Sequence, residues 1–477
     1  MPTTVDTTTT NQALHPDGFA KTANGVKWLA YDNGSNIELS YNDGGGWTSH
    51  GTVGSNGQEA SLFIDEDDYA HLAFIQSSAV HYWRGTPTDG TRTDWTWDGP
   101  YTHTGQDTEH SPRVVAHSEG TGWKAHIIFG AKDADSWSNG TWWYRRKCGH
   151  GSAGGHTHAQ TCGGWTTGTP AGCIGFGTHS HYGSDLFCGP TCEAWPNNGS
   201  ARNCVALQLT PHTHSPIDNG TDSYYEVTSS GTDYYNRVYY VRLDITAAHV
   251  ITTEQASQQL DIQGDYNESH PFIDFAHTGD GKTPKASPHV FVGWQNRSGE
   301  TYYLQLTYAG GWSSWSSKVL CKSGEYAGYA VGGYNGSDMV IFHRDQSSSV
   351  RLLGWHVSDA QVATQYPTIP DLPYNLKCVG VALDGDIVYL FAADVTQKDL
   401  LVMVYDGSWA ADWETVEVAD IEDPYFPNQI VVERHATASV VGITFLEGSA
   451  SPWDLDFVEY GVSVVGGGGF GFIPIGG

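Results

Sequence analysis

A repeat runs through most of this sequence and limits the folds that the chain can adopt. The repeated phrase is an apolar strand, a short turn, a second strand rich in aromatic residues, and a Gly-rich turn that ends on tryptophan. Its clearest copy runs from Gly25 to Ser49, and a second copy closes at Trp95 and Trp97. A period of roughly 45–50 residues is the length of one four-stranded propeller blade. We therefore predict an all-β protein folded as a six- or seven-bladed β-propeller.

Five further copies bring the visible total to seven. They begin near Ser111, His270, Ala327, Cys378 and Asn428. Frequent glycine (58 residues) and few charged residues (16%) suit many short strands joined by tight turns. We expect the inner strand of each blade to carry the apolar core, as in His71–Ile75, Ile127–Gly130, Val290–Gly293 and Val388–Phe391.

The repeat also defines the domain organisation. Residues 1–18 form an N-terminal extended segment, which is either disordered or a strand that docks elsewhere. Blades 1–3 occupy 19–146, a Cys/His-rich loop insertion occupies 147–233, and the remaining blades occupy 234–462, with 234–243 as a candidate strand to complete the third blade. Residues 463–477 are a Gly-rich C-terminal tail. It is either an apolar segment that inserts into a neighbouring subunit or blade, or a tail that simply follows the last strand.

The closing turn of the first copy resembles the Asp-box of sialidase-like (BNR-repeat) propellers. Ser40, Asn42, Gly44 and Trp47 follow the Ser-x-Asp-x-Gly-x-x-Trp pattern, with Asn in place of Asp. A short polar side chain and glycine suit a tight turn, while the tryptophan packs between blades. The resemblance implies a structural motif. The arginine-containing opening of the sialidases is absent, because Phe472 is followed directly by Ile-Pro, so sialidase activity is disfavoured.

Two blade openings are similar to those of BNR-type propellers that include polysaccharide lyases. If the chain were such a lyase, His110 or His270 would serve as the base and Arg113 would hold the uronate carboxylate. The alternative is that these residues set the turn into the next strand, and we favour it because they lie in loops.

The insertion contains six of the eight cysteines and little apolar periodicity. Such a segment needs cross-links, so we expect three disulfides of undetermined connectivity. The cysteines concerned are Cys148, Cys162, Cys173, Cys188, Cys192 and Cys204.

Histidines in the same segment offer a second interpretation. Three His-x-His pairs would each present two imidazoles on one side of an extended strand, to a divalent transition metal or calcium. These histidines are His156, His158, His179, His181, His212 and His214. The alternative is a set of merely polar loops.

Aromatic residues near the insertion are the candidate carbohydrate-binding residues. Sugar rings pack their apolar faces on Trp and Tyr, with polar side chains beside them. Aromatics that repeat from blade to blade are expected in the core, so the non-repeated Trp142, Trp143, Tyr144 and Trp165 are the better candidates.

Charge and surface signals narrow the partners. The net charge of −30 disfavours nucleic acid, and no apolar run is long enough to insert into a membrane. Eight cysteines and seven Asn-x-Ser/Thr sequons indicate an extracellular or virion-surface protein.

The sequence therefore favours a carbohydrate- or receptor-recognition protein of a virion or cell surface, such as a tail-fibre or host-attachment component. Its partners would be a surface glycan or glycoprotein and other copies or virion proteins. Binding is favoured over catalysis because it needs only aromatic platforms and hydrogen-bond partners. The alternatives are a secreted polysaccharide lyase or glycoside hydrolase, and a structural decoration or adaptor protein of a particle.

Overall fold

The computed structural model places strands along most of the chain. It describes residues 2–9, 17–103, 108–147, 159–162, 206–212, 222–260, 271–286, 289–295, 301–308, 312–317, 319–322, 331–344, 350–373, 376–394, 399–417, 430–436, 440–447, 453–463 and 471–472, with backbone alone over the strands of 132–236. Within these ranges the regular structure is all β, and no helix is long and apolar enough to cross a membrane.

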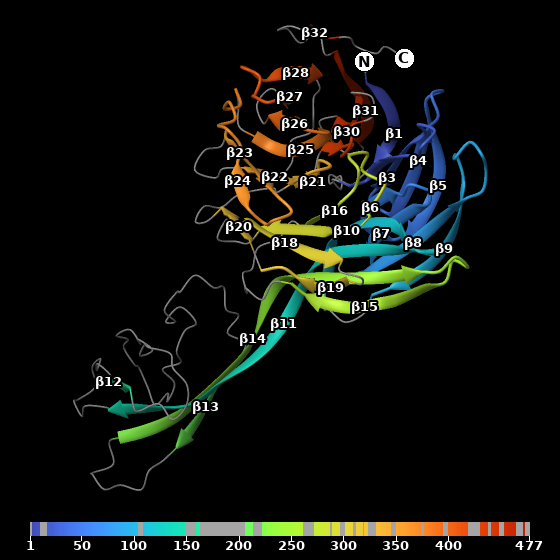
Figure 1. Cartoon of the computed structure of the whole chain (residues 1–477). Coiled ribbons are helices and arrows are strands. Elements are labelled where there is room, and N and C mark those ends of the chain that lie inside the picture. The colour runs from blue at the N-terminus through green and yellow to red at the C-terminus, as the bar shows by residue number, and fades with distance from the viewer. Residues whose placement is uncertain are drawn as a thin grey trace. The chain divides into compact units, whose positions relative to one another are not determined.

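Seven antiparallel sheets form the blades of a propeller, which confirms the predicted fold class (Figure 1). Blade 1 has β2 (Phe19–Lys21), β3 (Lys27–Asp32), β4 (Asn36–Asn42) and β5 (Trp47–Ser55), innermost strand first. Blade 2 has β6 (Gly57–Ile64), β7 (Ala70–Gln76), β8 (Ala79–Pro87) and β9 (Trp95–Thr102). Blade 3 has β10 (Thr108–Glu119), β11 (Gly122–Lys147), β14 (Asp222–Ile245) and β15 (Ile251–Gln259), with β12 (Ala159–Cys162) and β13 (Ala206–His212) paired to β11 and β14.

The second half of the chain repeats the pattern. Blade 4 has β16 (Phe272–Phe275), β17 (Val290–Gln295), β18 (Thr301–Tyr308) and β19 (Trp312–Trp315), with β20 (Val319–Lys322) also on β18. Blade 5 has β21 (Val331–Tyr334), β22 (Met339–Arg344), β23 (Leu352–Val357) and β24 (Ala363–Gln365). Blade 6 has β25 (Leu376–Asp384), β26 (Ile387–Asp394), β27 (Leu400–Tyr405) and β28 (Glu414–Glu417). Blade 7 has β29 (Ile430–Val432), β30 (Val440–Glu447), β31 (Trp453–Ser463) and β1 (Thr3–Thr9).

Strands from the two ends of the chain share blade 7. The N-terminal β1 pairs antiparallel with β31, where Thr3 lies opposite Phe457, and β32 (Gly471–Phe472) pairs with the end of β31. Of the two alternatives for the N-terminal segment, the docked strand is therefore correct for 3–9. The tail residues 464–470 and 473–477 lie outside the described residues.

The apolar segments predicted to be inner strands are the second strands of their blades, counted from the axis. His71–Ile75 lies in β7 and Val290–Gly293 in β17, whereas the innermost strands are β6 and β16. Both strands of each pair are buried on both faces, so apolar content alone does not separate them. The predicted addition of 234–243 to the third blade is correct, because these residues belong to β14.

The core is divided among the blade junctions. Seven apolar clusters are found among the described residues, and each joins two neighbouring blades. At the junction of blades 7 and 1, the Trp47 ring lies 5.1 Å from the ring of Phe457, centre to centre. In the preceding turn Asn42 Oδ1 accepts a hydrogen bond of 2.8 Å from Gly44 N. The Asp-box-like residues thus act in a turn and a blade contact, while the family resemblance itself stays a prediction.

Two blades contain a buried histidine–tyrosine pair at equivalent places on their second and third strands. In blade 2, His71 Nδ1 lies 2.7 Å from Tyr82 Oη, and His71 Nε2 lies 3.0 Å from Asp65 Oδ2. In blade 3, His126 Nδ1 lies 2.7 Å from Tyr240 Oη. All of these side chains are fully or almost fully buried. Burial lowers the pKa of both histidines, so both are neutral at pH 7.

A second compact unit comprises residues 133–235 and 264–266. Its described part is strand backbone: β12 pairs with β11, where Tyr144 lies opposite Cys162, and β13 pairs with β14, where His212 lies opposite Tyr224.

Candidate functional site: an axial cavity

Charged side chains from several blades meet where the innermost strands converge. Asp17, just before β2, lies 3.3 Å from Arg113 Nε through Oδ2 and 2.5 Å from Arg434 Nη2 through Oδ1. Arg434 Nη1 also donates a 2.6 Å hydrogen bond to the carbonyl oxygen of Ile273 and lies 3.8 Å from Asp274 Oδ2. We call Asp17, Arg113, Asp274 and Arg434 the axial network. Because it joins blades 1, 3, 4 and 7, it ties together strands far apart in the sequence.

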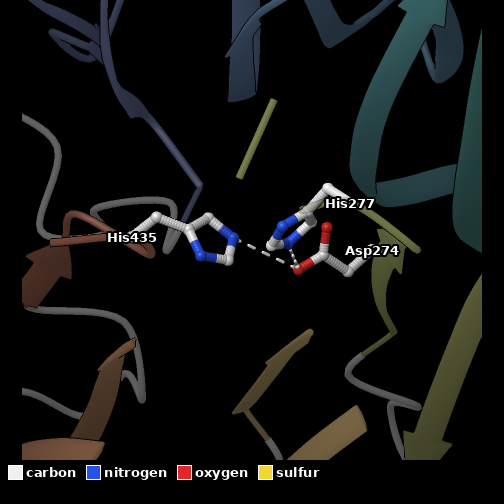
Figure 2. A group of neighbouring side chains, drawn as sticks. All are labelled: Asp274, His277 and His435. Carbon is white, nitrogen blue, oxygen red and sulfur yellow. Dashed lines mark ion pairs between the residues drawn. The ribbon is translucent and has the colours of Figure 1, made fainter. Parts of the chain in front are cut away.

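Asp274 stands beside two histidines, as Figure 2 shows. Its Oδ2 lies 3.4 Å from His435 Nε2 and 4.0 Å from His277 Nε2, and it accepts a 2.7 Å hydrogen bond from Tyr334 N. Burial alone would raise the pKa of Asp274, but Arg434 and the histidines outweigh it and hold that pKa well below its usual range. Burial and the neighbouring His435 lower the pKa of His277 to about 3, so this imidazole is neutral at pH 7.

Asp274, His277 and His435 also offer three ligand atoms within 4.8 Å of one another, which is close enough for a shared metal ion. The Nδ1 atom of His277 accepts hydrogen bonds from Gly279 N (3.0 Å) and Gly281 N (3.1 Å). A neutral imidazole with an accepting Nδ1 has its proton on Nε2, the atom that a metal would need. Oδ2 of Asp274 is also already used by an N–H donor and a guanidinium. The residues therefore fit a carboxylate surrounded by N–H donors better than a metal centre.

A cavity of about 570 Å³ lies beside this cluster. Its lining comes from residues 17, 19–23, 62–64, 66, 114, 279–283, 384 and 432–436, which belong to blades 1, 2, 3, 4, 6 and 7. Phe19, Phe63 and Val432 supply apolar wall, while Lys282, Glu433 and Asp384 supply charge. Asp17 and Arg434 line both this cavity and a void of about 30 Å³, so the axial network separates the two spaces.

The loop after β16 shapes one wall of the cavity. Asp280 Oδ1 accepts hydrogen bonds from Lys282 N (2.9 Å) and Thr283 N (2.8 Å), which fixes a turn that directs Lys282 inward. The Nζ atom of Lys282 donates to the main-chain oxygen of Lys21. Gly281 has φ +76°, and a Cβ there would lie 2.2 Å from the His435 ring. Glycine is therefore required at 281, both for the backbone conformation and for the approach to His435.

Two of the three candidate lyase residues lie within the described chain. His110 is partly buried with its ring packed against Gly130, where a Cβ would lie 2.3 Å from that ring, and burial lowers its pKa to about 4. Arg113 belongs to the axial network and also donates a 3.2 Å hydrogen bond to the carbonyl oxygen of Pro271. His270 lies outside the described residues. The lyase assignment stays a prediction.

The candidate residues of the insertion stay predictions as well. Trp142, Trp143 and Tyr144 are in β11, whose side chains are not described there, and Trp165 is outside the described residues. Among the cysteines and histidines, Cys162 lies in β12 and His212 in β13. The others, Cys148, Cys173, Cys188, Cys192, Cys204, His156, His158, His179, His181 and His214, are outside the described residues. Elsewhere, Cys321 is a buried free thiol whose pKa burial raises to about 12.

Sequence reasoning missed Asp274, Lys282 and His435, although one signal was present. Asp274 interrupts the apolar run Phe-Ile-Asp-Phe-Ala, and a carboxylate inside such a run must find cations or N–H donors in the fold. Lys282 and His435 lie in loops of blades 4 and 7 and give no comparable local pattern.

Comparisons with known proteins give no family. No family model and no curated protein matches the chain. Among solved structures, the chain is similar to polysaccharide lyase Uly1 (11% identity, covering 94% of this chain and 90% of that chain, TM-score 0.44). It is also similar to an oligogalacturonate lyase in complex with manganese (10%, 92% and 94%, 0.37) and to a fucose-specific lectin from Aleuria aurantia (14%, 76% and 94%, 0.34). All three TM-scores are below 0.5, so these similarities have no weight in the argument about function.

Proposed function

We propose that this propeller is a carbohydrate-recognition protein that takes a saccharide unit into the axial cavity. The observation behind the proposal is the cavity itself, whose volume of about 570 Å³ falls in the range of small-molecule sites. Its lining combines apolar wall with charged donors and acceptors, which is the combination that a sugar ring with hydroxyl groups requires.

Each kind of lining residue has a part in binding. The Lys282 ammonium donates hydrogen bonds to ring or hydroxyl oxygens, and the Asp384 and Glu433 carboxylates accept hydrogen bonds from hydroxyls. Phe19 and Phe63 supply the apolar wall for the carbon-bound face of the ring. Trp142, Trp143, Tyr144 and Trp165 would extend the contact to further sugar units. Carbohydrate is also the ligand or substrate class in the names of the similar structures, although the proposal does not depend on them.

We further propose that the protein acts at an extracellular or virion surface, as a tail-fibre or host-attachment component. Seven sequons, a cysteine-rich insertion and a net charge of −30 support an exposed, soluble setting that repels nucleic acid. Glycoprotein receptors and other copies of the chain are the partners that this role implies.

The test is a glycan array followed by calorimetry with Lys282→Met. We expect the variant to lose at least about tenfold in affinity, because a hydrogen bond to a charged donor contributes about 1.5–3 kcal/mol. Lys285→Met is the matched control: Lys285 is in the same loop but bonds to Tyr334 Oη and does not line the cavity. Equal binding by wild type and Lys282→Met would place the ligand outside the cavity, and a protein that binds no glycan would contradict the proposal.

A further inference from the structure

The ionisable residues of the axial cavity identify the class of saccharide that it accepts, provided that the proposed carbohydrate function is correct. Among the described residues that line the cavity, five are acidic and three are lysine or arginine, a formal excess of two negative charges. The acidic residues are Asp17, Glu66, Asp280, Asp384 and Glu433, and the basic residues are Lys21, Lys282 and Arg434. We propose that the cavity selects neutral saccharides and excludes those with a carboxylate, sulfate or phosphate group.

Two of the three cations are already neutralised by neighbours. Lys21 Nζ lies 2.8 Å from Glu433 Oε1, and Arg434 Nη2 lies 2.5 Å from Asp17 Oδ1. Both pairs are largely buried, which strengthens the attraction within each pair and ties up the cation. An incoming anion would have to break one of these pairs before Lys21 or Arg434 could bind it.

Lys282 is the remaining cation, and its surroundings suit a hydroxyl oxygen better than an anion. Its one described hydrogen bond goes to the main-chain oxygen of Lys21, which leaves two N–H groups for a ligand. Burial lowers the pKa of Lys282, and the neighbouring carboxylates of Asp68, Asp65, Glu433 and Asp280 act against that effect. Lys282 is therefore a strong donor within a negative field.

The remaining carboxylates complete this field. Glu66 Oε1 accepts a 2.9 Å hydrogen bond from Ser118 N and another from Ser118 Oγ, while Oε2 has no hydrogen-bond partner among the described residues. Asp384 and Asp280 add two more carboxylates to the lining. A neutral sugar can accept from Lys282 and donate to these carboxylates without net repulsion, whereas a uronate meets them with the same sign of charge.

The experiment compares one glycan in three charge states. An array with neutral, uronate-, sialate- and sulfate-bearing glycans first identifies the tightest binder. Calorimetry then measures the neutral glycan, the same glycan oxidised at C6 to the uronate, and the methyl ester of that uronate. We expect the uronate to bind at least about tenfold more weakly than the neutral glycan, and the ester to regain most of the loss, because the ester has the bulk of the acid without its charge.

Two controls separate the cavity from the overall charge of the protein. In 1 M salt the screening length is about 3 Å, so repulsion by the distant surface disappears while repulsion inside the cavity persists. The double variant Glu66→Gln/Asp384→Asn is expected to narrow the gap in affinity between the neutral glycan and the uronate. The matched variant Asp67→Asn/Asp412→Asn removes the same charge at exposed positions outside the cavity and is expected to leave the gap unchanged.

The outcomes distinguish this inference from the proposed function. Uronate or sulfated glycans that bind more tightly than the neutral form, with binding lost in Lys282→Met, would overturn the neutral specificity and leave carbohydrate recognition intact. A gap that vanishes in 1 M salt, or that Asp67→Asn/Asp412→Asn narrows as much as the cavity variant, would also overturn it. Absence of binding to every glycan class would contradict the proposed function, and this inference with it.

Discussion

Asp65–His71 in blade 2 and Asp274–His435 beside the cavity are the same chemical pair in two surroundings. In the first, His71 Nε2 contacts Asp65 and Nδ1 contacts Tyr82 Oη, so both ring nitrogens have partners and both side chains are fully buried. In the second, neither nitrogen of His435 has a hydrogen-bond partner among the described residues, and the ring lies at a cavity wall.

The difference separates a stabilising pair from one available for function. A fully satisfied buried network adds stability and rigidity, whereas polar atoms left without partners are characteristic of binding or catalytic sites. The Asp65–His71 pair of blade 2 therefore serves the fold alone. The Asp274–His435 pair lies beside Arg434, His277 and a cavity large enough for a ligand.

The largest expected effect comes from breaking the Asp65–His71 pair of blade 2. His71→Ala leaves Asp65 Oδ2 and Tyr82 Oη buried without that hydrogen-bond partner and opens a void, so we expect about 3–5 kcal/mol loss in the free energy of unfolding. Urea denaturation followed by tryptophan fluorescence measures it. Tyr82→Phe removes one hydrogen bond and should cost only about 1 kcal/mol. Similar losses for the two variants would show that Asp65 does not depend on His71.

Breaking the Asp274–His435 pair should lower the free energy of unfolding by less, and it should change how that free energy depends on pH. Because the pKa of Asp274 is lower in the folded state than in the unfolded chain, its carboxylate stabilises the protein above about pH 4, and that contribution is lost as the pH falls towards the folded pKa. We expect Asp274→Asn to cost about 3 kcal/mol at pH 7. Its acid denaturation curve below about pH 4 should also be flatter than that of the wild type. Parallel curves would contradict this account.

The contact between Gly281 and His435 provides a smaller perturbation. Gly281→Ala combines a strained φ of +76° with a Cβ 2.2 Å from the His435 ring, so we expect about 2 kcal/mol of destabilisation and weaker glycan binding. Gly279→Ala is the control, since φ is +107° but no atom lies within 4 Å of its Cβ. Thermal unfolding and calorimetry measure both. Equal losses of affinity would mean that backbone strain, and not displacement of His435, is responsible.

For lyase activity we expect no measurable product, and for His110→Ala no change in glycan affinity. Incubation with acidic polysaccharides should produce no unsaturated uronates absorbing in the ultraviolet, since the net negative lining of the cavity disfavours such substrates. His110→Ala, which changes a partly buried side chain outside the cavity lining, should leave glycan affinity unchanged in the folded protein. Product formation that His110→Ala abolishes would establish the lyase alternative and refute our choice of binding over catalysis.

Sequence reasoning reached the propeller because its evidence is local. The turn at Asn42 and Gly44 and the tryptophan at Trp47 recur with the blade period, and each acts within one hairpin or junction. His71–Ile75 is the second strand of blade 2, and its apolar pattern does not give that rank because the innermost strand beside it is also largely buried. Only the pairing pattern between strands separates them.

The cavity could not be predicted in the same way. Lys282, Glu433 and Asp17 come from three different blades, and no spacing in the sequence indicates that they share one space. His110 and Arg113 were selected as neighbours in sequence, but one packs on Gly130 and the other joins the axial network. Proximity along a strand says little about convergence at the axis.

The pairing of β1 with β31 determines when the propeller can close during synthesis of the chain. Thr3 Oγ1 donates a hydrogen bond to the carbonyl oxygen of Phe457, 454 positions later, so β1 cannot pair until β31 has been made. Until β31 emerges, blade 7 lacks its third strand, β1 has no strand to pair with, and the Phe19–Phe457 stack at the junction with blade 1 cannot form. Blades 1–6 can assemble in order during synthesis, but the ring becomes a closed body in a single late step. The ring of blades around the axial cavity is therefore closed only after β31 has been synthesised.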